Sequence, residues 1–221
     1  MSLELSGTTG VKGVAGSVSA PSIVGDDTNT GISFPSADTI KFSTGGVERM
    51  SITNSGVSGI TAGITEADQW RVTSDFTMGQ FAANITSNWE RNDTSFEKIG
   101  TGMSVNGSNG HWTFPSTGKW LIQVHWMGRR ASGNTYSGLH YIFGMSDGNQ
   151  SNGFDLATSE VGNGANENVN TAFMQVIFDV QDTSTHRVLF GYYDYYTQTT
   201  VYKGHTSKNE NSYTFIKLGE T

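Results

Sequence analysis

The segment GKWLIQVHWM, residues 118–127, most constrains the fold of this chain. Large apolar residues occupy every second position in it, namely Trp120, Ile122, Val124 and Trp126. Because successive side chains of a β-strand point to opposite faces of a sheet, this pattern predicts a strand with one face in a core. The segment therefore indicates a packed β domain.

Several other stretches after residue 63 have the same character, and clusters of Gly, Asn, Asp and Ser separate them. The expected strands are 67–73, 110–114, 139–145, 171–180, 186–196, 200–204 and 212–218, and the expected turns include 103–110, 146–153 and 162–170. The segment 82–90 lacks an apolar stripe and is expected to be a loop. With 28 Gly and 15% charged residues, the chain is predicted to be all-β, with a sandwich or barrel over 64–221.

The first 63 residues are small and polar, and contain no Trp or Tyr. Ile40 with Phe42, and Met50 with Ile52, alternate with polar residues on either side of Gly45-Gly46, which predicts a hairpin. A lone two-stranded hairpin is marginal in water. We therefore expect three copies to intertwine about a threefold axis, with these four apolar residues at the trimer interface. A flexible linker is the alternative.

Charge and composition exclude several classes of partner. The net charge is −7 and the 13 Lys and Arg are scattered, so no nucleic acid partner is expected. No apolar run approaches the roughly 18 residues of a membrane span, so membrane insertion is not expected. The first residues lack a basic region followed by an apolar core, and we expect a chain made in the cytoplasm. With no cysteine, stability must come from packing or assembly.

Signals of catalysis and metal binding are weak. Residues 144–148 fit GxSxG, but that motif needs a helix after a strand, and no helical pattern follows. The five histidines show no HExxH spacing. Asp147, Asn149 and Ser151 resemble the opening of a calcium loop, but Asn152 stands where the turn glycine is needed. We predict no catalytic residue, metal or cofactor, and a protein that is not an enzyme.

Residues 20–59 resemble a module common in tail-fibre and virion-appendage proteins of marine, cyanophage-like bacteriophages. The resemblance rests on Ala20-Pro21-Ser22-Ile23, the run from Gly25 to Ile32, Phe34-Pro35, Ala37-Asp38 and the run from Gly45 to Met50. In those proteins such modules resemble stems that lead to another domain. One copy is present here, which implies a short stem.

Residues 64–221 resemble the jelly-roll head shared by complement component q and tumour necrosis factor. The resemblance rests on Phe96–Ile99, Trp112–Pro115, Gly118–Trp120, Asp179 ahead of Arg187–Phe190, and Ser212–Leu218. It implies ten short strands in two sheets and a homotrimer whose axis is lined by one sheet. The collagen-like stalk often joined to such heads is missing, because no glycine recurs at every third position.

The run Tyr192–Tyr196 has two interpretations. It could form an aromatic platform for sugar rings, or its tyrosines could alternate between the sandwich and neighbouring subunits. The resemblance places this strand in the inner sheet, so Tyr193 and Tyr195 are predicted at the trimer interface. Receptor contacts are then expected from the loops 130–138, 146–155 and 162–168, with the candidates Arg130, Asn134, Tyr136, Asn149 and Asn152.

These observations predict a bacteriophage virion protein in three parts. Residues 1–19 would attach to another virion protein, 20–63 would form a trimeric β stem, and 64–221 would form the jelly-roll head. The expected function is that of a tail fibre or receptor-binding protein, exposed on the particle, that attaches to a bacterial surface glycan or protein. The alternatives are a capsid head fibre or decoration protein, a surface-glycan hydrolase, and a secreted signalling or lectin-like head.

Overall fold

The computed structural model describes residues 4–6, 10–12, 15–60, 63–77, 83–93, 95–130, 136–163, 169–194 and 200–221. Of residues 4–6, 10–12, 130, 136–137, 161–163 and 194 it describes the backbone alone. The chain divides into two compact units, Met1–Gly63 and Ile64–Thr221, which we call the N-terminal unit and the C-terminal unit.

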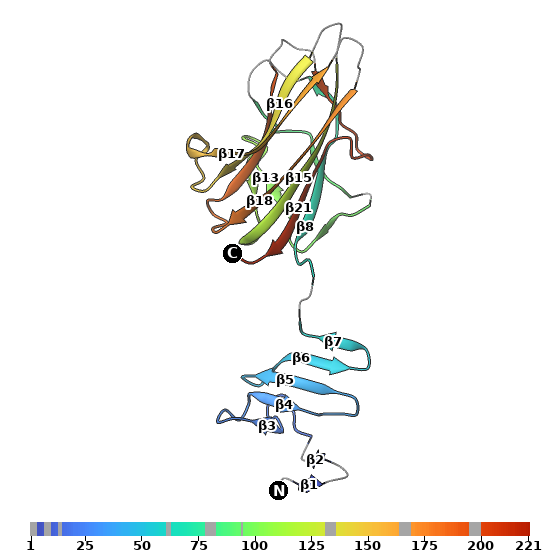
Figure 1. Ribbon diagram of the computed structural model, residues 1–221, viewed down its shortest axis with the longest axis vertical. Helices are drawn as coiled ribbons and strands as arrows, with labels where there is room; N and C mark the ends of the chain where they lie inside the picture. The colour runs from blue at the N-terminus through green and yellow to red at the C-terminus, as the bar shows by residue number, and fades with distance from the viewer. Residues whose placement is uncertain are drawn as a thin grey trace. The chain divides into compact units, whose positions relative to one another are not determined.

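The N-terminal unit contains an antiparallel sheet in which each strand pairs with the next one along the chain (Figure 1). The expected hairpin at residues 40–52 is confirmed, and it forms the middle of this five-stranded sheet. Gly45 and Gly46 make its turn with φ angles of 59° and 72°, a conformation that favours glycine. The strands are β3 (Ile23–Val24), β4 (Gly31–Ser33), β5 (Ile40–Thr44), β6 (Val47–Thr53) and β7 (Gly56–Ser58), preceded by the pair β1 (Glu4–Ser6) and β2 (Gly10–Lys12).

The C-terminal unit is built from two antiparallel sheets (Figure 1). The eight-stranded sheet has the order β11-β8-β21-β15-β20-β9, with β12 on β8 and β18 on β15. The six-stranded sheet has the order β13-β14-β19-β16-β17, with β10 on β19. The first sheet comprises β8 (Ala67–Val72), β9 (Phe76–Thr77), β11 (Trp89–Arg91), β12 (Lys98–Ile99), β15 (Gly118–Arg130), β18 (Val169–Val180), β20 (Thr200–Tyr202) and β21 (Ser212–Gly219). The second comprises β10 (Ala83–Asn84), β13 (Ser104–Val105), β14 (Trp112–Thr113), β16 (Tyr136–Met145), β17 (Phe154–Asn163) and β19 (Arg187–Asp194).

The core of the C-terminal unit is formed by the alternating apolar residues of the central strands. Trp120, Ile122, Val124 and Trp126 of β15 are buried, as their spacing predicted, and belong to one cluster with residues of β16 and β19. Trp112 is fully buried, and its ring meets Trp70 and Trp89 edge-on at centroid distances of 5.1 and 5.0 Å. Edge-to-face aromatic pairs contribute about 0.5–1.5 kcal/mol each beyond the area they bury.

Three segments of the C-terminal unit differ from expectation. The sequence did not indicate β17, because few of its side chains are apolar. Among the described strands it pairs with β16 alone, at the edge of its sheet. β13 lies inside the expected turn 103–110, and the expected loop 82–90 contains β10 and the start of β11. These strands are two or three residues long, too short for an alternating pattern to develop. The sheets therefore hold more strands than the ten implied by resemblance.

Candidate functional site

The N-terminal unit reverses the usual placement of polar and apolar side chains. Among residues 15–60, three serines are the buried residues, Ser33, Ser43 and Ser51, and every apolar residue is half-buried or exposed. The Oγ atoms of Ser51 and Ser58 lie 2.7 Å apart, and Ser43 Oγ donates a hydrogen bond to the Gly31 carbonyl. In this part of the chain the five-stranded sheet has no apolar core of its own.

Cross-strand pairing gathers most of the apolar residues of this sheet on one face. Register pairs Ile40 with Ile52, and Phe42 with Met50. The same ladder continues in both directions along the sheet. We call this surface the apolar face, and it consists of Ile23, Ile32, Ile40, Phe42, Met50, Ile52 and Val57. The structure thus brings together the four residues of the N-terminal unit that the sequence predicted at a trimer interface.

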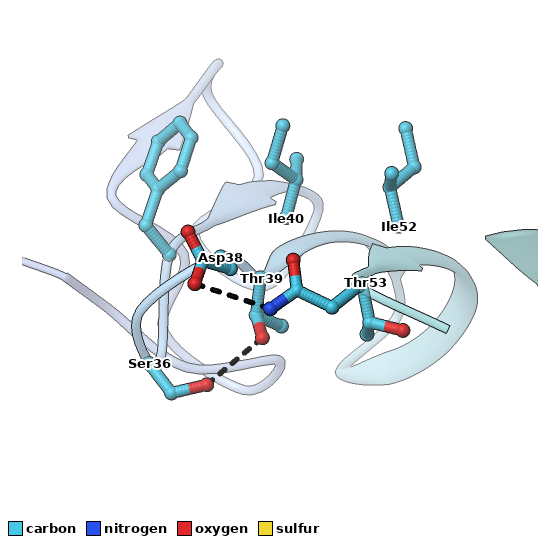
Figure 2. A pocket seen from close by; sticks show the side chains of 8 residues that line it. Ser36, Asp38, Thr39, Ile40, Ile52 and Thr53 are labelled. Carbon is cyan, nitrogen blue, oxygen red and sulfur yellow. Dashed lines mark hydrogen bonds between the residues drawn. The ribbon is translucent and has the colours of Figure 1, made fainter. Parts of the chain in front are cut away.

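A hollow of about 440 Å³ lies at one end of the apolar face. Figure 2 shows Ile40 and Ile52 pointing to the same side, while polar residues close the base of the hollow. There Asn54 Nδ2 donates to the Asp38 carboxylate at 3.2 Å, and Ser36 Oγ donates to Thr39 Oγ1 at 2.9 Å (Figure 2). The hollow therefore has apolar side chains at its opening and hydrogen-bonded polar side chains at its base.

The eight-stranded sheet of the C-terminal unit also has an exposed outer surface with apolar residues. Phe173 and Ile177 of β18 are 58% and 59% exposed, and they pair with His125 and Leu121 of β15. The cross-strand row between these two pairs consists of Gln175, Gln123 and Thr214. We call this surface the uncharged face, and it consists of Leu121, Gln123, His125, Phe173, Gln175, Ile177, Thr214 and Ile216. The spacing of β15 predicted that Leu121, Gln123 and His125 lie opposite the core.

The predicted receptor residues at 146–155 take part in the hydrogen bonds of their own turn. Asn149 caps a 3₁₀ turn, Gln150–Asn152, by accepting from the Ser151 backbone N–H, and Asn152 Nδ2 donates to Asp147 at 2.7 Å. Arg130 and Tyr136 lie at the ends of β15 and β16, with only their backbone described. Asn134 and part of the loops 130–138 and 162–168 lie outside the described residues.

The first three residues of the tyrosine-rich run, Tyr192–Asp194, end β19, which belongs to the six-stranded sheet. Tyr192 is buried in the core, whereas Tyr193 points outward and lines a groove with Leu139, Tyr141 and Phe143 of β16. Tyr195 lies outside the described residues. Tyr193 is on the sheet opposite the uncharged face, so its role as a trimer contact stays a prediction without support from this geometry.

The described residues form neither a nucleophile elbow nor a cluster of metal ligands. Ser146 is followed by a turn and the short 3₁₀ segment, so the strand-to-helix elbow that GxSxG requires is not formed. Among the described residues, no three His, Asp or Glu side chains come together as metal ligands. The same residues include no helix long and apolar enough to span a membrane.

Neither a scan against protein-family models nor a search of curated proteins finds a match for this chain. Among solved structures, Eiger TNF from S. frugiperda is similar with a TM-score of 0.55 at 9% sequence identity, covering 72% of this chain and 96% of that chain. The C-terminal unit has a TNF-like jelly-roll fold. Murine APRIL at pH 5.0 gives a TM-score of 0.47 at 9% identity, covering 69% of this chain and 98% of its own. At such low identity the likeness concerns the fold of the TNF-like jelly roll alone.

Proposed function

We propose that this protein is a homotrimeric bacteriophage appendage that attaches to a bacterial surface component, a glycan, through its TNF-like jelly roll. The resemblance of residues 20–59 to tail-fibre modules of marine phages supports the phage origin. In this proposal residues 1–19 join another virion protein, and the rest of the N-terminal unit is the stem. The protein acts on the outside of the particle.

The observation that carries the proposal is the apolar face of the N-terminal unit. A sheet with one apolar face is stable when that face is covered by another layer, and among residues 15–60 no buried apolar residue supplies one. Three copies around an axis cover each other's faces and leave none exposed. The apolar face is therefore the contact between stems.

The charge distribution permits contact between copies of the same chain. Each chain carries a net charge of −7, so the electrostatic repulsion between copies is smallest where they meet through surfaces without carboxylates. The apolar face and the uncharged face both have this property, since their residues are apolar, amide, hydroxyl or imidazole. One face in each unit would then hold the trimer.

Attachment by such a particle is multivalent. Three weak sites on one trimer, repeated over several trimers, raise the effective affinity by about 10²–10⁴ without any strong individual contact. A binding site on this protein therefore needs only modest affinity for its ligand.

Light scattering on the purified full chain tests the assembly, and competition with phage for host cells tests the function. We expect three times the chain mass of 23.8 kDa, and saturating protein should slow phage adsorption. The mass of one chain would overturn the trimer. Trimers that leave adsorption unchanged would overturn receptor binding, and labelled electron microscopy would then show whether the protein sits on the capsid.

A further inference from the structure

The outer surface of the six-stranded sheet carries a groove of about 320 Å³. This groove belongs neither to the apolar face nor to the uncharged face. Three strands and one turn contribute its lining. The residues are Leu139, Tyr141 and Phe143 of β16, Tyr193 of β19, Asp155 of β17 and Gln150 of the 3₁₀ turn. These outward positions alternate with His140 and Ile142, which are buried in the core.

A missing side chain at the centre of the sheet makes room for the groove. Gly191 pairs with Tyr141 across β19 and β16, and a Cβ at Gly191 would overlap the ring and hydroxyl of Tyr141. The Tyr141 ring can therefore lie over the backbone of β19. Tyr193 and Leu139 form the neighbouring cross-strand pair. The floor of the groove is thus a row of aromatic and aliphatic side chains.

Polar groups stand at the edge of this apolar floor. The Tyr141 hydroxyl donates to Asn84 Oδ1 at 3.4 Å, and Asn84 Nδ2 donates to Gln150 Oε1 at 3.2 Å. Burial, and then the negative charge of Asp155, raise the pKa of Tyr141 to about 12, so its hydroxyl stays protonated at neutral pH. The amide of Gln150 and the phenol of Tyr141 are held in place by this chain of bonds.

Asp155 gives the groove its charge. Its side chain is exposed at the wall of the groove, and no described residue donates a hydrogen bond to its carboxylate. The lining residues include no Lys or Arg, so an anionic ligand would be repelled. A purely apolar ligand would cover the carboxylate without giving it a donor, which is costly. The ligand that fits has one apolar surface and several hydroxyl donors.

We propose that this groove binds a neutral pyranose ring of a surface glycan. The apolar C–H side of the ring lies on Tyr193 and Tyr141, and its hydroxyls donate to Asp155 and exchange hydrogen bonds with Gln150. The site adds detail to the proposed function, and the choice of a glycan as its ligand rests on that function. It differs from the sequence prediction, which placed Tyr193 at the trimer interface. The receptor contacts predicted from the sequence were Arg130, Asn134, Tyr136, Asn149 and Asn152.

Saturation-transfer NMR on the full chain tests the groove with the methyl glycosides of glucose, galactose, mannose and N-acetylglucosamine. Galacturonate serves as the anionic comparison. We expect at least one neutral glycoside to bind saturably and galacturonate to bind more weakly. Tyr193→Ala and Asp155→Asn should each weaken binding at least tenfold. Glu220→Gln, which removes an exposed carboxylate elsewhere on the chain, should leave it unchanged.

Three results would overturn the site: no neutral glycoside binds, galacturonate binds best, or both groove variants bind like the wild type while keeping its thermal unfolding temperature. The failure of the proposed function is distinguishable from these. If the protein binds glycosides through the groove but does not compete with phage, the site is supported and the proposed function is overturned. If trimers block adsorption equally well with and without Tyr193→Ala, the proposed function is supported and the site is overturned.

Discussion

The guanidinium of Arg91 holds the carboxylate of Asp68 through two hydrogen bonds, 2.9 Å from Nε to Oδ1 and 3.1 Å from Nη2 to Oδ2. Asp68 is fully buried, and Trp70 Nε1 and the Met103 backbone N–H donate to the same carboxylate at 2.8 and 2.7 Å. This one acceptor therefore joins β8 to β11 and to the segment before β13.

We expect Asp68→Ala to lower the free energy of unfolding by about 3–5 kcal/mol, because it leaves several buried donors unpaired. Denaturant unfolding of the purified chain measures the loss. Lys119→Ala, which breaks an exposed ion pair with Asp179 at 3.7 Å, is the matched control and should cost at most about 1 kcal/mol. Equal losses in the two variants would contradict this prediction.

His140 should make the C-terminal unit less stable in acid. Its ring lies 3.9 Å from that of Trp126, and burial lowers its pKa to about 3 from an ordinary value of 6.5. The unfolded state therefore takes up a proton as the pH falls below 6.5, while the folded state does so only near pH 3. Stability is present above pH 6.5 and is lost towards pH 3, by about 1.4 kcal/mol per pH unit.

Unfolding in urea at several values between pH 7 and pH 4 measures this dependence. His140→Gln should reduce the slope by about 1.4 kcal/mol per pH unit, since its side chain does not titrate. Identical slopes for His140→Gln and the wild type would show that another group is responsible.

The apolar face predicts a difference between two matched substitutions. Ile52 is 38% exposed on that face, whereas Val24 is 44% exposed and pairs with Gly31 on the opposite side of the sheet. If the face is a trimer contact, Ile52→Ser should promote dissociation on dilution, because it puts a hydroxyl into an apolar interface. Val24→Ser should not. Analytical ultracentrifugation over a range of concentrations compares them, and equal dissociation would argue against this contact.

A methyl group added at Gly191 is expected to disturb the groove. Gly191→Ala should force the Tyr141 ring to move and lower the free energy of unfolding by about 1–3 kcal/mol, as overpacking does. Gly219→Ala is the control, because nothing lies within 4 Å of a Cβ there. It should change stability by no more than about 0.5 kcal/mol. Chemical denaturation of the two variants gives the comparison, and a neutral Gly191→Ala would mean that Tyr141 does not lie over β19.

Local patterns predicted part of the candidate sites. Alternation identified both faces of β15, and the paired glycines identified the β5–β6 hairpin, because side-chain direction and turn geometry depend on neighbouring residues. The same alternation placed Ile40 and Ile52 on one side of the sheet. The turn at 146–153 was recognised, but Asn149 and Asn152 were assigned to receptor binding although their side chains serve the turn itself.

By itself, then, the sequence determined that the chain is all-β, which side chains of its longest strands share a face, and that its first quarter has little to bury. Only the tertiary structure decided that Tyr141 lies over Gly191, and that Asp155 and Gln150 meet Tyr193 at one groove. The physical reason is register: a strand's own pattern fixes which way each residue points, but the residue it meets is fixed by pairing between segments far apart in the chain.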